Sequence, residues 1–238
     1  DVAGRSKSDK KHFPDMIKYM DKQLGQLIAK LKRDGLWENT ILIFTADNGT
    51  TTKTTSRMKD GSLVQGGKGT TTEYGTHVPL IITWGSKLKG GHVSDKLVDL
   101  TDFLPTFADA MGVKVPKEWD TDGISLYPEL CGKAPLPREY SICHFNPCWP
   151  TSPTANAARM VRTARYKLYH DGRFIDASTD KLDQHPIPPG KGSTEAEAVR
   201  KRLQEIMDKL PAWTPEKGMP RKGDYGTFYD FAGPQNPF

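Results

Sequence analysis

Two short, unbroken apolar runs constrain the fold of this chain more than any other feature. Residues 40–45 and 78–84 are rich in β-branched side chains and too short for helices, which is typical of strands that are covered on both faces. Apolar residues at helical spacing occupy residues 14–34, and Gly35 follows them as a helix stop. The succession of helix, strand, loop and strand predicts an α/β architecture.

A second helical pattern follows the second strand. Residues 98–111 carry apolar side chains on one face and end before Gly112, which predicts a helix packed on the sheet. Residues 114–137 contain four prolines and are expected to be a linker. We therefore expect residues 1–134 to form the α/β part and residues 135–238 to form a separate, smaller domain.

The smaller domain is predicted to be an antiparallel sheet with one packed helix and an irregular tail. Strands are expected at residues 139–145 and 158–169, the second of them bent into a hairpin around residues 163–165. Thr194 and Glu197 have the spacing of a capping box, which predicts that a helix starts there.

Composition and charge exclude several functional classes. The 34 basic and 29 acidic residues are dispersed, so the net charge of +5 indicates no nucleic-acid module. No apolar run approaches the roughly 18 residues that a helix needs to span a membrane, so no membrane-spanning helix is expected. The three cysteines lack zinc-site spacing and allow at most one disulfide within the chain.

Asp47 and Asn48 stand directly after the first strand. The carboxyl ends of strands in open α/β sheets are common ligand sites, and a carboxylate beside an amide carbonyl offers hard oxygen donors for Ca²⁺ or Mg²⁺. The alternative is a tight turn, because Asn48-Gly49 accepts positive φ at little cost.

Lys68 lies between two glycines in the segment that leads to the second strand. Glycines let a backbone approach a ligand closely, and the Lys68 ammonium can meet an anionic oxygen as a point charge. The spacing differs from that of a nucleotide-binding P-loop. The alternative is a flexible, solvated loop with an exposed lysine.

Taken together, these segments resemble the sulfatase family of the alkaline-phosphatase-like superfamily, over residues 14 to about 210. The resemblance rests on IFTADNG at 43–49, GKGTT at 67–71 with Glu73 and Gly75, VPLI at 78–81, DLTDFLPT at 99–106 and VRTARYKL at 161–168. It implies the carboxyl-terminal part of a sulfatase-like sheet domain, followed by a small antiparallel α+β subdomain.

The resemblance also implies roles for five residues. Asp47 and Asn48 correspond to ligands of a Ca²⁺ ion, with Mg²⁺ less fitting, and Lys68 to the sulfate-binding lysine. His77 stands where the family commonly has arginine, and His144 lies where the small subdomain can face the substrate, so both are candidates for substrate binding. A cation and a lysine would stabilise the negative charge that develops during sulfate-ester hydrolysis.

The nucleophile motif of the family is not found in the residues before Asp47. Sulfatases use a formylglycine made from a Cys/Ser-x-Pro-x-Arg motif, and the segment at Cys148 lacks its arginine and follows the metal pair. We therefore expect formylglycine in an N-terminal half of the same protein, to which this chain would be an excised or processed complement. Two ligands are too few for Ca²⁺, so the chain alone should bind the ion weakly and be inactive.

The resemblance implies a sulfate-ester substrate, either a sulfated saccharide or an aryl sulfate, and a periplasmic or secreted location. Two other functions stay open. One is a phosphate-ester hydrolase of the same superfamily, and the other is a noncatalytic module that binds anionic glycans through Lys68 and the basic strand. For Arg162, Arg165 and Lys167 on that strand, we expect a solvent-facing basic surface.

Overall fold

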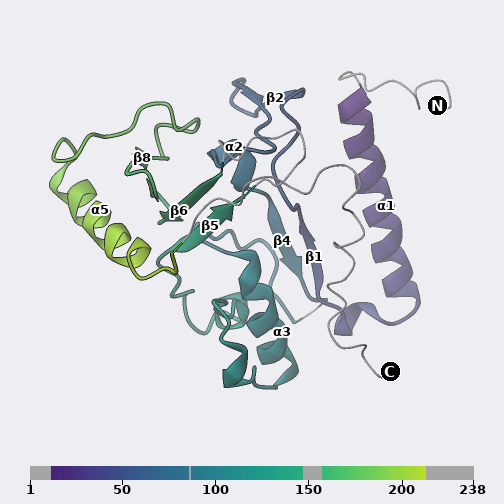
Figure 1. Ribbon diagram of the computed structural model, residues 1–238. Coiled ribbons are helices and arrows are strands. Elements are labelled where there is room, and N and C mark those ends of the chain that lie inside the picture. The colour runs from purple at the N-terminus through teal and green to yellow at the C-terminus, as the bar shows by residue number, and fades with distance from the viewer. Residues whose placement is uncertain (1–11, 86, 147–156, 213–238) are drawn as a thin grey trace, which may run out of the picture. The chain divides into compact units, whose positions relative to one another are not determined.

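The computed structural model describes residues 12–85, 87–146 and 157–212, and these form two compact units that divide after Ser141 (Figure 1). The predicted boundary at residue 134 separates domains that fold independently. A division into compact units does not test independent folding, so the boundary stays a prediction. The α/β class with a small antiparallel sheet is confirmed. No helix within these ranges is long and apolar enough to cross a membrane.

The first unit opens with one long helix and contains the two expected strands. Helix α1 (Phe13–Arg33) ends before Gly35, whose φ of 71° suits glycine. Strand β1 (Leu42–Thr45) pairs antiparallel with β4 (Leu80–Thr83) in a two-stranded sheet. The expected cover on both faces is wrong for this unit, because β1 is half-buried throughout and Ile81 is 61% exposed.

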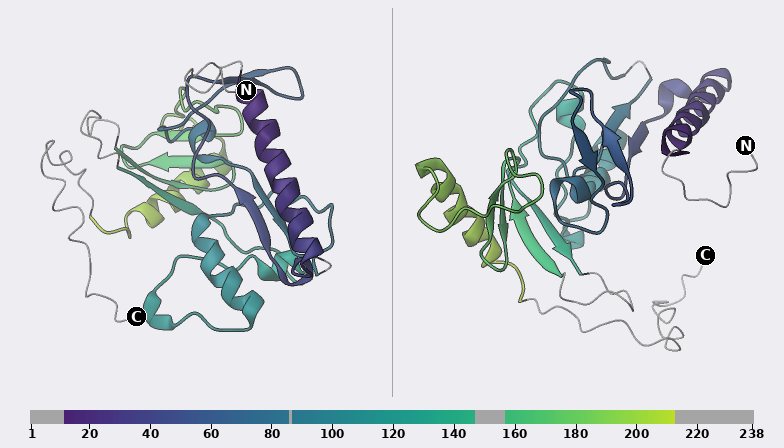
Figure 2. Two further views of the ribbon diagram at one scale, coloured as in Figure 1. Left: turned by 90° about the vertical axis from the view of Figure 1, so that its right-hand side faces the viewer. Right: turned by 90° about the horizontal axis from the view of Figure 1, so that it is seen from above.

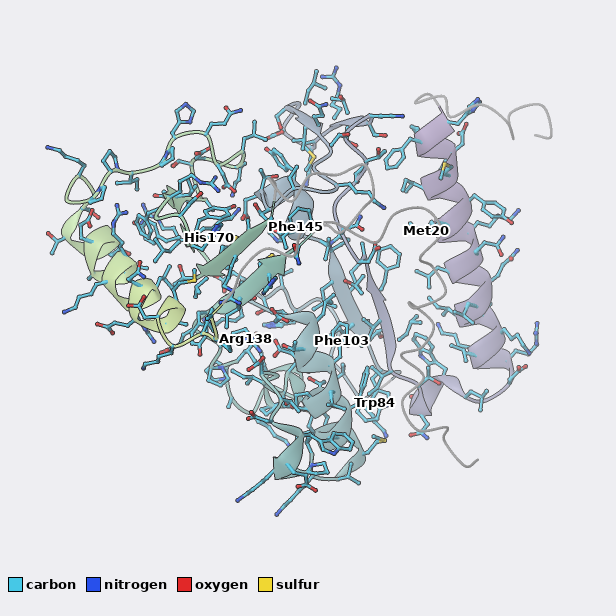
Figure 3. All side chains as sticks on the ribbon, viewed as in Figure 1. Met20, Trp84, Phe103, Arg138, Phe145 and His170 are labelled. Carbon is cyan, nitrogen blue, oxygen red and sulfur yellow. The ribbon has the colours of Figure 1, made fainter. Side chains whose placement is uncertain are left out.

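Helix α1 leaves much of its apolar face uncovered in the part of the chain that the structure describes, although Leu24, Ile28 and Leu31 are half-buried. None of its residues is buried, and Met16 and Met20 are 64% and 40% exposed (Figure 3). Tertiary packing of an apolar face normally supplies most of the stability of a helix, so this face is suited to contact further polypeptide.

The stretch between the two strands has more structure than its polar composition predicts. Strands β2 (Thr55–Arg57) and β3 (Leu63–Gln65) form an antiparallel hairpin, and α2 (Glu73–Thr76) is a single helical turn. Gly61 in the hairpin turn has a φ of 85°. The Asp60-Gly61 pair is the sequence signal that could have predicted this hairpin.

The predicted helix over residues 98–111 begins as the 3-10 turn η4 (Leu100–Asp102) and continues as α3 (Phe103–Met111). It packs mainly against the short helix α4 (Tyr127–Leu130) and not, as predicted, against the sheet. The remaining short elements of this unit are η3 (Trp37–Asn39) and η5 (Lys117–Trp119).

Asp102 joins the start of α3 to the irregular segment that follows it. Its carboxylate is fully buried, accepts hydrogen bonds from the backbone N–H of Asp99 (2.9 Å) and Ile124 (2.7 Å), and forms an ion pair with Arg138. Arg138 also donates to the Asp122 carbonyl oxygen at 3.0 Å. One buried carboxylate thus fixes three segments that have little regular structure of their own.

The second unit is a sheet covered on one face by a helix. Its four strands lie in chain order, and the β6–β7 and β7–β8 pairs are antiparallel. They are β5 (Ser141–Phe145), β6 (Ala158–Arg162), β7 (Tyr166–Tyr169) and β8 (Phe174–Asp176), the last of which the sequence analysis missed. Helix α5 (Thr194–Met207) packs on β6 and β7 (Figure 2). Leu203 meets Val161 and Leu168 in the core between them.

The capping of α5 differs from the prediction by one residue. Ser193, and not Thr194, is the N-cap, and its side chain accepts from the Ala196 N–H at 3.1 Å. Glu197 accepts from the Gly192 N–H at 2.9 Å. Both hydroxyl residues can cap, so sequence spacing alone could not choose between them. The predicted irregular tail lies almost wholly outside the described residues.

Candidate functional site

Asp47, Asn48 and Gly49 follow β1, and the segment is held by backbone contact. The Asp47 side chain is exposed, and the Asn48 amide nitrogen donates to the Gly49 carbonyl oxygen at 2.9 Å, which leaves the amide oxygen as an acceptor. The Gly49 N–H donates to the Gly75 carbonyl oxygen at 2.9 Å. A Cβ on Gly49 would lie 1.8 Å from the Tyr74 carbonyl oxygen.

These contacts change the reading of Asn48-Gly49 as a tight turn. Gly49 does not have a positive φ, so glycine is not required there by turn conformation. It is required because another backbone segment lies against it.

The Lys68 segment contacts the same strand end. The Lys68 N–H donates to the Thr50 carbonyl oxygen at 2.9 Å, and a Cβ on Gly66 would lie 2.3 Å from that oxygen. Gly67 is buried, and a Cβ there would lie 2.6 Å from the Tyr74 carbonyl carbon. The segment is therefore packed backbone against backbone, which disfavours the flexible-loop alternative, while the Lys68 side chain itself is exposed.

We call the segments 47–51, 66–70 and 72–76 the glycine junction. Gly75 completes it, because a Cβ there would lie 2.1 Å from the Thr70 carbonyl oxygen and 2.7 Å from that of Gly67. The Thr70 hydroxyl donates to the Gly67 carbonyl oxygen at 2.8 Å. The backbones that carry Asp47, Asn48 and Lys68 are thus held in one compact piece of structure.

Glu73 is a site feature that the sequence analysis quoted but did not assign. It begins α2 within the glycine junction and is only 5% exposed. Its carboxylate lies 3.5 Å from Nδ1 of His77, and the His77 imidazole is exposed. A buried carboxylate is costly unless it has partners, so the burial of Glu73 indicates that the junction supplies partners for it.

His144 lies in the second unit, on β5. Its Nδ1 is 3.4 Å from Nη2 of Arg159 on the neighbouring strand. The roles expected for His77 and His144 in substrate binding stay predictions.

The expected solvent-facing basic surface is only partly present, because Arg165 is 48% exposed and Arg162 half-buried, but Lys167 is not exposed at all. Lys167 is fully buried and lies 3.2 Å from Oδ1 of Asp183, and Arg165 binds Asp176 through Nε and Nη2 at 3.0 and 2.7 Å. Arg162 donates to carbonyl oxygens of the hairpin turn that follows it. Internal partners therefore use these charges, and a glycan-binding surface on this strand loses its support.

The donors at the glycine junction fit part of a site for a hard cation. Asp47 offers a carboxylate and Asn48 an amide oxygen, and the Thr45 hydroxyl two residues earlier is buried without a hydrogen-bond partner in the described structure. Within residues 12–85, 87–146 and 157–212, no three His, Cys, Asp or Glu side chains form a metal-binding group. Ca²⁺ needs about 6 to 8 oxygens, so these donors are a partial set. Cys148 lies outside the described residues.

Family models match most of the chain. One described as "Sulfatase" matches residues 8–113, and one described as "N-sulphoglucosamine sulphohydrolase, C-terminal" matches residues 68–210. Together they include the glycine junction and the sheet of the second unit.

Individual relatives agree with these matches. Human arylsulfatase A is 35% identical over 66% of this chain and 30% of its own length. The protein BT4656, solved in complex with its substrate D-glucosamine-2-N,6-O-disulfate, matches with a TM-score of 0.62 and 25% identity. The match covers 81% of this chain and 38% of the BT4656 chain. A phosphonate monoester hydrolase from Silicibacter pomeroyi has a TM-score of 0.58 and 28% identity, over 79% of this chain and 38% of its own. The chain spans less than half the length of these proteins.

Proposed function

Because the chain belongs to the sulfatase family, we propose that it is the carboxyl-terminal segment of a sulfuric-ester hydrolase and supplies part of the site for a divalent cation and a sulfate group. The observation that carries this proposal is the glycine junction. The hydrogen bonds from Lys68 to Thr50 and from Gly49 to Gly75 hold the segment with two hard oxygen donors beside the segment with an exposed ammonium.

Each residue has a defined task in this proposal. Lys68 binds a sulfate oxygen and stabilises the charge that develops on the group during ester cleavage. Asp47 and Asn48 hold the cation. Hard oxygen donors of this kind suit both Ca²⁺ and Mg²⁺, and membership of the sulfatase family makes Ca²⁺ the proposed ion. When bound, that ion supplies Lewis-acid polarisation of the sulfate. His77, which lies 3.5 Å from Glu73, binds the remainder of the substrate, and His144 is a separate substrate-binding candidate within the second unit.

Further sulfatase sequence completes the site. The formylglycine nucleophile and the missing cation ligands are expected in an N-terminal half, without which this segment is inactive. The exposed apolar face of α1 and the exposed Ile81 on β4 support such a partner, because apolar patches of this kind mark contact surfaces. A periplasmic or secreted location belongs to the same proposal.

The substrate class that we propose is a sulfated saccharide. The match to an N-sulphoglucosamine sulphohydrolase model over residues 68–210 and the relative bound to a disulfated glucosamine support it. The likeness to arylsulfatase A makes an aryl sulfate the alternative substrate, to be compared in the same assay.

The test uses the protein expressed from the complete reading frame that contains this chain. We expect hydrolysis of glucosamine sulfates with Ca²⁺ present, loss of that activity in Lys68→Ala, and normal activity in Lys59→Ala, a control on the exposed β2–β3 turn. Hydrolysis of nitrophenyl sulfate alone would favour the aryl alternative. Full activity in Lys68→Ala would contradict the proposed role of the glycine junction.

A second candidate activity is hydrolysis of phosphate or phosphonate esters. The likeness to a phosphonate monoester hydrolase favours it, because lysine and a hard cation would also suit a phosphonate oxygen. The two activities separate when a sulfate ester and a phosphonate ester with the same leaving group are compared in one preparation. A larger kcat/KM for the phosphonate ester would replace the sulfatase proposal.

A further inference from the structure

The β2–β3 hairpin presents one exposed face, within the same unit as the glycine junction. Its register pairs Thr55 with Gln65 and Arg57 with Leu63. These four side chains are exposed, whereas the central residue of each strand, which points the other way, is half-buried. We call the four residues the hairpin face. In Figure 1 the hairpin lies above α2, beyond β1 and β4.

Hydrogen bonds orient two polar side chains of the hairpin face. Arg57 Nη1 donates to the Gly61 carbonyl oxygen at 3.3 Å, so its Nε and Nη2 groups remain as donors. Gln65 Nε2 donates to the Thr52 carbonyl oxygen at 2.7 Å, which leaves the amide oxygen as an acceptor. Leu63, across from Arg57, is 63% exposed. The face therefore combines a guanidinium, an amide and an apolar surface.

The charge of this part of the chain is positive. Residues 50–72 contain four basic side chains and a single acid, Asp60. The Asp60 carboxylate accepts from the N–H and the hydroxyl of Ser62, at 2.9 and 2.6 Å. Among the residues that the structure describes, Arg57 has no carboxylate partner. Its charge is therefore available to an anionic ligand.

Backbone hydrogen bonds connect the hairpin to the glycine junction. The Gly66 N–H donates to the Thr54 carbonyl oxygen and the Lys68 N–H to that of Thr50, both at 2.9 Å. Leu63 lies five positions before Lys68, so the two backbones are at most about 18 Å apart. A ligand of several sugar residues can extend over such a span.

We propose that the hairpin face binds an anionic sugar of an oligosaccharide, another sugar of which carries the sulfate at Lys68. Arg57 donates to a sulfate or carboxylate oxygen, because a guanidinium presents several donors to such a group. Leu63 contacts the apolar side of the sugar ring, and Thr55 and Gln65 form hydrogen bonds with its hydroxyl groups. The saccharide class rests on the proposed function, which this inference narrows to substrates of more than one sugar.

The first test measures binding to this chain without turnover. Leucine methyl and glutamine amide signals are followed by NMR while a heparin tetrasaccharide or inorganic sulfate is added. We expect the Leu63 and Gln65 signals to shift with the tetrasaccharide and to stay in place with inorganic sulfate. No shift with the tetrasaccharide, or equal shifts with inorganic sulfate, would overturn the proposal.

Matched variants separate the hairpin face from general positive charge. Arg57→Gln should weaken tetrasaccharide binding about fivefold, the upper range for one exposed charged contact. Lys59→Gln, with the same loss of charge in the turn outside the face, should change it little. Leu63→Thr keeps the charge and suits a strand, and it should weaken binding about threefold. Equal losses in the two charge variants, or no loss in Arg57→Gln, would argue against the site.

Kinetics of the complete protein distinguish this inference from the proposed function. Arg57→Gln should raise KM for the tetrasaccharide more than KM for glucosamine 6-sulfate, and should spare kcat. Equal changes of KM for both substrates would remove the hairpin face and leave the sulfatase proposal standing. Absence of sulfatase activity, with tetrasaccharide binding that still depends on Arg57, would remove the proposed function and leave the binding site.

Discussion

The backbone N–H of Lys68 donates to the carbonyl oxygen of Thr50 at 2.9 Å, although 18 positions separate the two residues. This bond joins the segment that follows β1 to the glycine-rich segment before α2. The position of the Lys68 backbone relative to Asp47 and Asn48 is therefore set by main-chain hydrogen bonds, which do not depend on a bound ion.

Gly49→Ala should disrupt the glycine junction. Its Cβ would lie 1.8 Å from the Tyr74 carbonyl oxygen, so the two segments must separate, and we expect a loss of about 3 kcal/mol or more in unfolding free energy. Gly90→Ala is the control, because a Cβ there meets nothing within 4 Å. Equal urea midpoints for the two variants would show that the junction is not closely packed in solution.

Calcium should bind this chain weakly and through Asp47. With two oxygen donors the dissociation constant should be on the order of 10⁻³ M or weaker by calorimetry, and Asp47→Asn should abolish the binding. Asp95→Asn, an exposed acid elsewhere in the same unit, should change nothing. Micromolar affinity, or binding that survives Asp47→Asn, would contradict the assignment of the cation to this position.

Lys167→Met should strongly destabilise the second unit. Lys167 is fully buried against Asp183, whose carboxylate also accepts from the Tyr169 hydroxyl at 2.5 Å. Leaving that carboxylate without its cation should cost about 3–5 kcal/mol in denaturant unfolding. The double variant Lys167→Met/Asp183→Leu should lose less, and Lys181→Met on the exposed loop should lose almost nothing. A double variant that is worse than the single one would argue against charge as the cause.

Asp176 should make the second unit sensitive to acid. Burial alone would raise the pKa of Asp176, but hydrogen bonds from Arg165 and Ser178 outweigh it and hold the pKa below its ordinary value of 3.8. A lowered pKa in the folded state gives stability that is present above pH 3.8 and is lost as the pH falls through the folded value.

The variant Asp176→Asn tests this pH dependence. It should be less stable than the parent chain at pH 7, and the difference should shrink once the pH falls below about 4. Unfolding monitored by circular dichroism from pH 7 to 2 measures it. A difference that is constant over that range would assign the role of Asp176 to packing and not to charge.

The elements that the sequence predicted correctly are those whose signal is local. Helix α1 follows from apolar spacing and a terminal Gly35, and β1 and β4 follow from uninterrupted β-branched runs. The burial of β1 was not predicted correctly, because it depends on which segments cover the strand and not on its own residues.

The packing of the candidate site depends on contacts that composition does not report. From the sequence, Gly49 is predicted to be a turn residue, but in the structure the Tyr74 backbone lies against it. The glycine-rich segment is predicted to be solvated, but it contacts the backbone of residues 50 and 51. Lys167 likewise reads as a surface charge, because its partner Asp183 lies 16 positions away in a loop. Side chains with long-range partners are where sequence patterns give least information.

The buried carboxylate of Asp102 has a consequence for how this chain can vary. It fixes the backbone at Ile124 and the side chain of Arg138, while the connection over residues 113–121 is largely exposed and takes no part in that network. Insertions or deletions in the connection can therefore be accommodated without moving α3 or the bonded segments. A reporter domain can be attached, or residues removed, within this stretch. A change of length next to Asp122 or Arg138 would instead disrupt the buried ion pair between Asp102 and Arg138.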